Sequence, residues 1–269
     1  MVETPTLEQL AQRAANGDRN AVAAVVRALQ NDVYALALRI LWNPQDAEDA
    51  AQEILVRVVT RLGQFDFRSR LKTWVYRIAT NYLLDVKKSC VERQKLNFSS
   101  FAEDLADGLA ADDQPDQEQA LLTEEVKLGC TLGLLQCLDR PHRIAYVLGE
   151  IFEWPAPEAA EALGIDSAAF RTRLQRARQA IEEVTRAHCG LVSDAAACAC
   201  HRRVPAALRQ GRVDPERLRF ARAGASFAQA REFIRQVDMV RRVVVLQQTS
   251  GTEGPARDLA QIIATALAT

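Results

Sequence analysis

Apolar residues recur at intervals of three and four along most of this chain, and this spacing limits the fold more than any other feature. Between residues 70 and 88, for example, such residues stand at Leu71, Val75, Ile78 and Tyr82. This is the pattern of a helix with one buried face, whereas the strict alternation of a half-buried strand is nearly absent. The sequence therefore predicts an all-α fold.

The same spacing, together with turn residues, predicts where the helices begin and end. We expect helices over about residues 6–15, 18–41, 44–62, 70–92, 121–138, 141–152, 156–163 and 167–187. Thr6 and Gln9 are placed to form a capping box at the first helix. Asn43-Pro44 separates the second helix from the third, because proline is tolerated in the first turn of a helix.

Charge is balanced overall but unevenly distributed. The chain holds 34 basic and 35 acidic residues, so its net charge identifies no partner. Residues 61–95 hold nine Lys and Arg against three acids, residues 101–120 hold seven acids and no base, and residues 201–222 hold seven Arg against two acids. Such segregation favours surfaces with different partners, although solvated helix faces would look the same. The last run is predicted to contact either DNA or the acidic segment.

The acidic segment also suggests how the chain is divided. It contains a proline and no firm apolar stripe, and we interpret residues 97–120 as a linker. The linker separates a small helical domain of residues 1–96 from a second one of residues 121–187. A C-terminal extension of short helices, residues 188–269, follows.

Residues 155–181 predict a helix-turn-helix. The first helix ends at Gly164, which tolerates the left-handed conformation found after many helices. Asp166 or Ser167 then caps the second helix. Arg, Thr and Gln occupy the outward positions of that second helix, and these side chains can contact base edges and phosphates in a major groove. The alternative is an ordinary helical hairpin with a basic, solvated side.

Residues 65–88 combine aromatic rings with many basic side chains. Trp74 and Tyr82 fall on the apolar stripe and are predicted to be core residues. Lys72, Tyr76 and Thr80 form a stripe predicted to be exposed. This mixture of cations, a ring and neighbouring amides suits a single strand of nucleic acid, because cations follow the backbone and amides read an unstacked base.

Two segments of the chain resemble, in the same order, the conserved regions of one protein family. "DAEDAAQE" followed by "FRSRLKTWVYRIATNYLLDVKK" resembles region 2 of sigma-70-type transcription initiation factors. "LDRPHRIAYVLGEIFEWPAPEAAEALGIDSAAFRTRLQRAR" resembles their region 4. The resemblance covers residues 8–187, and the short acidic linker between the two regions is similar to that of the small extracytoplasmic-function (ECF) group.

The resemblance implies a bacterial factor that binds the β′ and β subunits of core RNA polymerase and directs the enzyme to promoter DNA. The residues implied for polymerase binding are Asp46, Glu48, Asp49, Gln52 and Glu53. Those implied for recognition and melting of the −10 element are Arg68, Lys72, Tyr76, Arg77, Thr80, Asn81 and Lys88. Those implied for recognition of the −35 element are Ser167, Arg171, Thr172, Arg173, Gln175 and Arg176.

Other functions fit less of the chain. A helix-turn-helix regulator that acts without polymerase would explain residues 155–181 but not residues 44–88. No Walker loop, HExxH or GxSxG motif occurs, so we expect neither a catalytic residue nor a required cofactor. The N-terminus lacks a secretory signal and no apolar run of 18 residues occurs, so we expect a cytoplasmic protein without membrane insertion.

Cysteines in the C-terminal extension suggest regulation. Cys189, Cys198, Cys200 and His201 predict a zinc site, and the single residue between Cys198 and Cys200 also suits Cu(I) or a redox pair. Three reduced thiols packed in a helical tail are the alternative, and Cys130 is interpreted as a small core residue. By resemblance, residues 188–269 are a regulatory module, a metal or redox sensor that replaces or supplements a separate anti-sigma factor.

Overall fold

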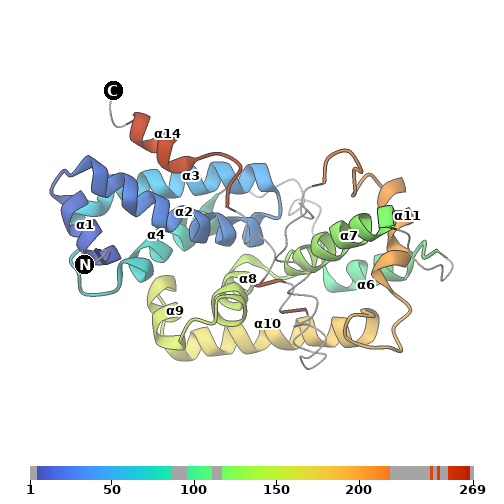
Figure 1. The fold of residues 1–269 in the computed structure, drawn as a ribbon. Helices are drawn as coiled ribbons and strands as arrows, with labels where there is room; N and C mark the ends of the chain where they lie inside the picture. The colour runs from blue at the N-terminus through green and yellow to red at the C-terminus, as the bar shows by residue number, and fades with distance from the viewer. Residues whose placement is uncertain are drawn as a thin grey trace. The chain divides into compact units, whose positions relative to one another are not determined.

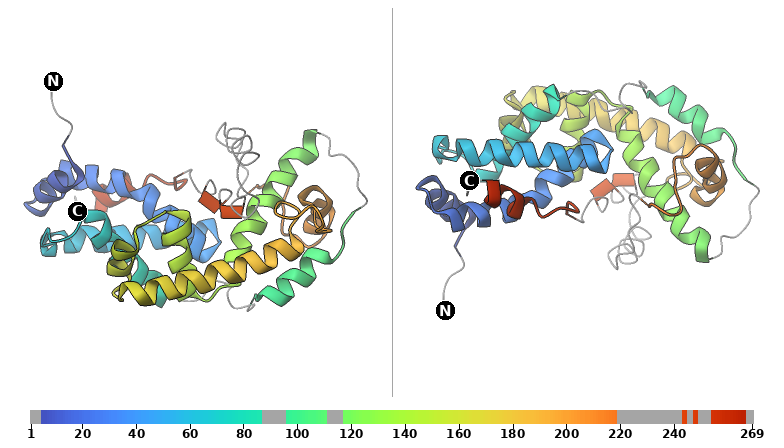
Figure 2. Two further views of the ribbon diagram at one scale, coloured as in Figure 1. Left: turned by 90° about the horizontal axis from the view of Figure 1, so that it is seen from below. Right: turned by 90° about the horizontal axis from the view of Figure 1, so that it is seen from above.

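The structure is a computed structural model of the 269-residue chain, and it describes residues 5–86, 96–110, 117–218, 243–244, 247–248 and 254–266. The regular structure of these residues is helical, with no strand among them (Figures 1 and 2), which confirms the all-α prediction. The chain forms two compact units that interleave in sequence. Unit 1 comprises Met1–Ser89, Trp154–Thr172 and Thr252–Thr269, and unit 2 comprises Cys90–Glu153 and Arg173–Gly251.

Unit 1 is a helical bundle built from three separate parts of the chain. Its helices are α1 (Leu7–Ala15), α2 (Arg19–Leu41), α3 (Pro44–Arg61), the short 3-10 helix η1 (Leu62–Gln64), α4 (Leu71–Asp85), α9 (Ala156–Leu163) and α14 (Leu259–Ala266). α2 packs against α1, α3 and α14, and α4 packs against α3 and α9. Helix α10 (Ser167–His188) begins in unit 1 and continues into unit 2.

Local capping explains why the first helices begin where the sequence predicts. The Thr6 hydroxyl accepts a hydrogen bond from the Gln9 amide at 3.2 Å, and the Gln9 side chain bonds back to the Thr6 amide at 2.8 Å. The Asn43 side chain accepts hydrogen bonds from the first amides of α3, with Pro44 at the first helical position. The capping box and the proline boundary are thus both confirmed.

α2 forms the centre of unit 1. By length and composition alone it is long and apolar enough to cross a membrane, with a mean hydropathy of 1.3 in its most apolar window. Half of that window is buried inside the protein, and Val25, Leu29, Val33 and Leu36 are fully inaccessible. The core helix of a soluble protein passes the same test, so α2 is described here as a core helix.

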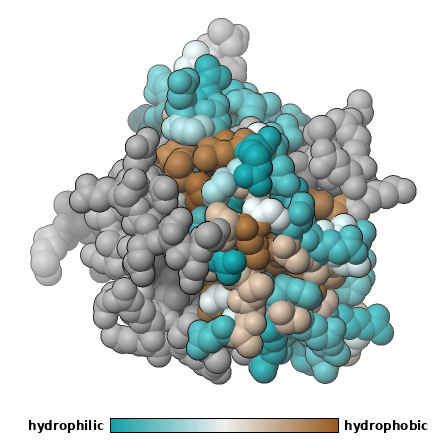
Figure 3. Space-filling model, turned by 90° about the vertical axis from the view of Figure 1, so that its right-hand side faces the viewer, coloured by the Kyte–Doolittle hydropathy of each residue, from teal (hydrophilic) through white to brown (hydrophobic). Residues whose placement is uncertain are grey.

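Unit 2 contains the remaining described helices. These are α6 (Phe98–Ala106), α7 (Gln117–Leu135), α8 (Arg140–Tyr146) with the π-helical turn η2 (Val147–Ile151), most of α10, and α11 (Cys200–Arg209). α7 packs against α11, around a small core of Val126, Val204, Ala207 and Val213. Figure 3 views the side on which α6, α7 and α11 lie, where hydrophobic residues reach the surface between hydrophilic ones.

The predicted linker is partly helical and is bound by the C-terminal extension. α6 lies inside residues 97–120, and its Asp104 forms ion pairs with Arg203 at 3.1 Å and Arg212 at 2.5 Å. The Arg202 guanidinium donates to the Ala110 carbonyl at 2.9 Å. The prediction that this basic run contacts the acidic segment is therefore confirmed for these three arginines. The helix was not predicted, although Phe98, Phe101 and Leu105 recur at helical spacing and Leu105 is buried.

A buried hydrogen bond joins α4 to α9. The Thr80 hydroxyl, which is 0 % exposed, donates to the Ala162 carbonyl at 3.0 Å. This carbonyl belongs to the last turn of α9, where backbone acceptors have no partner within the helix. Thr80 therefore satisfies an acceptor that would otherwise be buried without one.

Replacement of Thr80 by valine keeps the shape of the side chain but removes this donor. We expect the free energy of unfolding of unit 1 to fall by about 1–2 kcal/mol, because a buried carbonyl loses its partner. Urea unfolding followed by tryptophan fluorescence measures it, since all three tryptophans lie in unit 1. Thr60→Val is the matched control, because the exposed Thr60 hydroxyl only bonds to its own helix. Equal losses in the two variants would refute the role of Thr80.

Candidate protein-binding and nucleic-acid-binding surfaces

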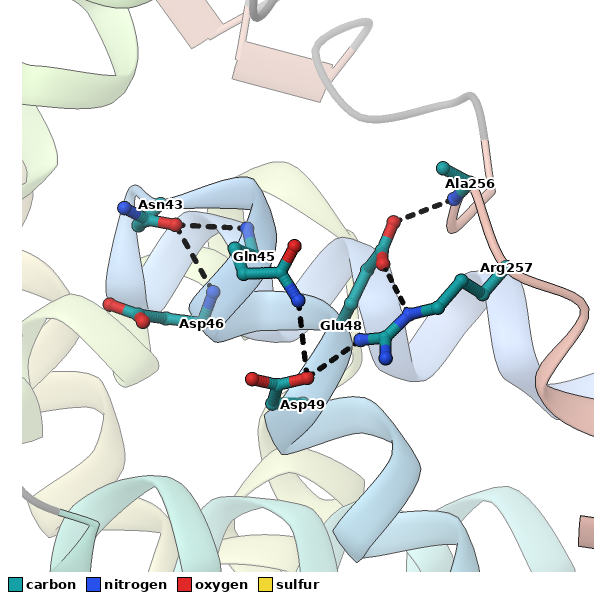
Figure 4. Close-up of polar contacts among 7 residues, drawn as sticks. All are labelled: Asn43, Gln45, Asp46, Glu48, Asp49, Ala256 and Arg257. Atoms are coloured by element: carbon teal, nitrogen blue, oxygen red, sulfur yellow. Dashed lines mark hydrogen bonds and ion pairs between the residues drawn. The ribbon is translucent and has the colours of Figure 1, made fainter. Parts of the chain in front are cut away.

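The residues predicted for polymerase binding lie along α3 from Asp46 to Glu53, and Figure 4 shows Asp46, Glu48 and Asp49 among them. Asp46 and Asp49 are exposed, and Gln52 and Glu53 are partly exposed. Asp46 sits in the first turn, where the helix dipole favours a carboxylate. Glu48 differs from the others because it is only 7 % exposed. The acidic face of α3 therefore presents the carboxylates of Asp46, Asp49 and Glu53 to solvent, whereas that of Glu48 is covered.

A pocket lies beside this face, between α3 and α4. Its lining residues are Arg57, Arg61, Trp74, Arg77, Ile78, Asn81, Tyr82 and Asp85. The Arg57 guanidinium stands 4.7 Å from the centre of the Tyr82 ring and donates to the Glu53 carboxylate at 2.8 Å. Two aromatic rings, three arginines and one amide thus share one cavity, a combination that can stack an unpaired base and hold its phosphates.

The structure exchanges the roles that the sequence predicted for two pairs of residues on α4. Tyr76 and Thr80 were expected to be exposed, but they are 3 % and 0 % exposed. Trp74 and Tyr82 were expected to be core residues, but both are partly exposed and line the pocket. The predicted exposure of Tyr76 and Thr80 is therefore wrong, and their assignment to DNA binding stays a prediction.

The cause is a neighbour that the pattern of α4 cannot reveal. α9 packs on α4, and the Trp154 ring just before it lies 4.5 Å from the Tyr76 ring. Burial consequently raises the pKa of the Tyr76 hydroxyl. Because α9 was assigned to a separate domain, the stripe of α4 that it covers was taken to face solvent.

The other residues predicted for −10 recognition remain accessible. Arg68, Lys72, Arg77 and Asn81 are exposed, and Arg77 and Asn81 line the pocket. Two of these residues form ion pairs within unit 1, Lys72 with Asp32 at 2.6 Å and Arg68 with Asp66 at 3.3 Å. Lys88 lies outside the described residues.

The residues predicted for −35 recognition lie along one helix, α10. Arg171, Thr172, Gln175 and Arg176 are exposed, and Ser167 and Arg173 are partly exposed. The opposite side of the helix is apolar and buried. Gly164 ends α9 with φ +64°, as predicted for the turn.

Asp166, rather than Ser167, caps α10. Its carboxylate accepts hydrogen bonds from the Ala169 and Ala168 amides at 2.8 and 2.9 Å. These amides hold the pKa of the Asp166 carboxyl below its ordinary value. The cap fixes the start of the helix and so the direction of the exposed side chains.

The cysteines of the extension gather, but not as predicted. The backbones of Cys189 and Cys198 run side by side in an isolated β-bridge, and both thiols are free. The Gly190 amide donates to the Cys198 carbonyl at 2.9 Å. Burial, with a smaller effect of Cys189, Cys200 and Cys198 nearby, raises the pKa of Cys130, which was interpreted from the sequence as a small core residue. Burial raises the pKa of Cys198 to about 11 and that of Cys200 to about 12, so these thiols are protonated near neutral pH.

This arrangement does not support the predicted metal site. Within the part of the chain that the structure describes, no group of three or more His, Cys, Asp or Glu side chains is placed to hold a metal ion. His201 does not join Cys189, Cys198 and Cys200 in such a group. The protonated thiols also disfavour a reactive redox pair, which requires a thiolate.

Comparison with known proteins identifies the family. Residues 25–89 match the model of sigma-70 region 2, and residues 128–181 match that of sigma-70 region 4. The chain is 30 % identical to the ECF RNA polymerase sigma factor SigW of Bacillus subtilis over 182 residues. The aligned residues cover 63 % of this chain and 91 % of SigW. The chain belongs to the sigma-70 family, in its ECF group. It is a transcription initiation factor, and neither a polymerase-independent regulator nor a sensor is supported as its function.

Other related proteins align with a similar share of this chain. The sigma factor CnrH of Cupriavidus metallidurans is 33 % identical over 173 residues, which cover 63 % of this sigma factor and 88 % of CnrH. A solved structure of CnrH in complex with the cytosolic domain of CnrY covers 65 % of this chain and 94 % of that one, at 23 % identity and a TM-score of 0.46. Both family matches end before Cys189, so they leave the C-terminal extension without a counterpart.

Proposed function

We propose that this sigma factor uses three surfaces in promoter recognition. The acidic face of α3 binds core RNA polymerase, the pocket between α3 and α4 captures unpaired bases of the −10 element, and the exposed side of α10 reads the −35 element. The observation that carries the proposal is the pocket, because it joins stacking rings, arginines and an amide next to the acidic face.

The pocket suits bases that have left the duplex. Unstacking one base step costs a few kcal/mol, and stacking on an aromatic side chain returns about 1–3 kcal/mol per base. Trp74 and Tyr82 supply the rings, and the three arginines attract the displaced backbone. Contacts of the polymerase with DNA would contribute the remainder. The sigma factor then needs no nucleotide hydrolysis, no catalytic residue and no cofactor.

The acidic face suits a basic protein surface. Asp46, Asp49 and Glu53 present carboxylates on successive turns of one helix, so a partner that carries Arg or Lys can contact several at once. We assign this partner to the β′ subunit of polymerase, with further contacts to β. The corresponding location is the cytoplasm, where polymerase and promoter DNA are found together.

Two further roles concern the extension and its partners. A separate anti-sigma protein is a proposed partner, since the related CnrH is described in complex with the cytosolic domain of CnrY. A zinc or copper ion at the cysteines of the extension is a further proposal, although the described residues bring no three ligands together. Metal analysis of the purified chain tests it.

Run-off transcription with purified core polymerase tests the proposed function. We expect the chain to direct polymerase to discrete start sites and Arg176→Ala to reduce initiation there about 5- to 150-fold, because one good base contact contributes about 1–3 kcal/mol. Arg186→Ala is the matched control, since Arg186 is exposed near the other end of α10. A chain that neither binds core polymerase nor starts transcription would refute the proposal.

A further inference from the structure

The end of the described chain lies on the acidic face of α3. Ala256 and Arg257 stand more than two hundred residues from Glu48 in sequence, yet they contact it directly (Figure 4). The helix that follows them, α14, runs beside α2 and α3 (Figure 1). These parts all belong to unit 1, so the contacts form within one compact body.

Both oxygens of the Glu48 carboxylate are bound by this segment. The Ala256 amide donates to Oε1 at 2.8 Å, and Nε of Arg257 donates to Oε2 at 2.7 Å. The second arm of the same guanidinium, Nη2, reaches Oδ1 of Asp49 at 2.6 Å. One arginine therefore bridges two of the five residues proposed to bind polymerase, and it explains why Glu48 is the covered member of that face.

The helix behind Arg257 is fastened by packing as well as by charge. Leu259, Ala260 and Ile263 are buried, and the Ala260 amide donates to the Gln30 side chain of α2 at 3.3 Å. Gly254 enters so close to Asn31 that an added Cβ atom would stand 2.2 Å from its Oδ1. A larger residue here would require the Asn31 side chain to move, so Gly254 allows the segment to pass close to α2.

We infer that residues 254–266 are a built-in competitor of the polymerase subunit that binds the α3 face. The inference rests on the proposed docking role of that face. Arg257 presents to Glu48 and Asp49 the same chemistry that a basic partner would, and both cannot occupy the carboxylates at once. The free chain then exists mostly in a covered form, and polymerase must displace the segment before it binds fully.

The consequence is a lower apparent affinity for core polymerase. A binding site that is open for only a fraction of the time binds more weakly by that fraction. The contacts of Arg257 are half-exposed and individually modest. We therefore expect residues 254–266 to lower the affinity for core polymerase without preventing its binding.

The test uses the full chain with two variants that release the segment in different ways. Arg257→Ala removes the ion pairs with Glu48 and Asp49. Ile263→Asp places a charge at a buried apolar position of α14 and so disrupts the packing of that helix. We expect the first variant to bind core polymerase about three- to tenfold more tightly than the natural chain, and the second at least as tightly. Arg27→Ala is the charge-matched control, because Arg27 is exposed on α2 outside the contacts of Figure 4.

Hydrogen exchange supplies a measurement that does not depend on affinity. The amides of α14 should be protected in the free chain, should lose protection when polymerase is added, and should be unprotected in Ile263→Asp. Protection of α14 that persists in the polymerase complex would overturn the inference. So would released variants that bind polymerase no more tightly than the natural chain.

Different results would refute the docking role of the α3 face and the competitor role of residues 254–266. Asp46→Ala changes a residue of the α3 face other than Glu48 and Asp49, which Arg257 binds, and it should weaken polymerase binding in both the natural and released chains. If Asp46→Ala weakens binding while the released variants match the natural chain, the competitor fails and the docking face stands. If no variant binds core polymerase, the proposed function fails and the competitor fails with it.

Discussion

Replacement of Arg143 by alanine is expected to destabilise unit 2 by about 3–5 kcal/mol, because several buried neutral oxygens lose their donor at about 1–3 kcal/mol each. Arg143 is 2 % exposed, although arginine is rarely buried unless its donors are bound. Its guanidinium donates to the carbonyls of Leu135 at 2.9 Å and Leu138 at 2.8 Å. It also donates to the side chain of Gln136 at 2.7 Å and more weakly to its carbonyl at 3.3 Å.

The effect is large because these acceptors follow from the end of a helix. α7 ends at Leu135, whose carbonyl also accepts a turn hydrogen bond from the Leu138 amide at 3.2 Å. Arg143, in the first turn of α8, donates to this carbonyl and to those of Gln136 and Leu138 beyond the helix end, and so holds the two helices together. Alanine would leave the Gln136 and Leu138 oxygens without this donor, at about 1–3 kcal/mol for each oxygen that water cannot reach.

Lysine should not restore this stability. Its ammonium is a single point of charge, whereas the planar guanidinium reaches several acceptors in fixed directions. Opening free energies from amide hydrogen exchange in α7 and α8 provide the measurement. Arg186→Ala, which removes an exposed arginine from α10, should change them by less than about 0.5 kcal/mol. An Arg143→Lys chain as stable as the natural one would show that charge alone is sufficient.

The helices could be predicted because their signals are local. Thr6 with Gln9, Asn43 with Pro44, and Gly164 all lie within a few residues of the boundaries that they set. The acidic start of α3 and the exposed side of α10 were predicted for the same reason. In each case the side chain's role depends on its own helix and not on a distant partner.

The roles that failed depend on neighbours from distant parts of the chain. Tyr76 and Thr80 are buried by α9, which follows them by about eighty residues. Glu48, predicted to bind polymerase, is covered by Arg257, which follows it by more than two hundred residues. Helical periodicity shows which residues share a face but not what packs on that face, and a pairing between distant charges leaves no mark on local sequence.

The largest functional effect is expected at the pocket between α3 and α4, which Trp74 and Tyr82 line. Trp74→Ala should reduce promoter opening about 5- to 150-fold, because it removes a ring whose stacking with a captured base is worth about 1–3 kcal/mol. Trp74 lines the pocket and packs 5.3 Å from the Phe65 ring, which fixes its orientation. Reactivity of unpaired thymines to permanganate in the −10 element measures the opening.

Tyr82 provides a second ring and a matched control. Its ring is held by Arg57 at 4.7 Å, and Arg57 is in turn fixed by Glu53. Tyr82→Ala should impair opening in the same direction as Trp74→Ala, whereas Tyr82→Phe keeps the ring and should open promoters nearly as well as the natural chain. Polymerase binding, measured separately, should change little in the alanine variants. A defect that arises entirely from weaker polymerase binding would contradict the pocket's role.

A template that is already unpaired at the −10 element separates capture from melting. If the rings stack on captured bases, the alanine variants should still bind such a template more weakly than the natural chain, because the lost contact is made to the separated strand. If the rings acted only to force the strands apart, an unpaired template would restore the variants completely. Because the pocket is lined with rings and cations at once, the first result is the one that its chemistry favours.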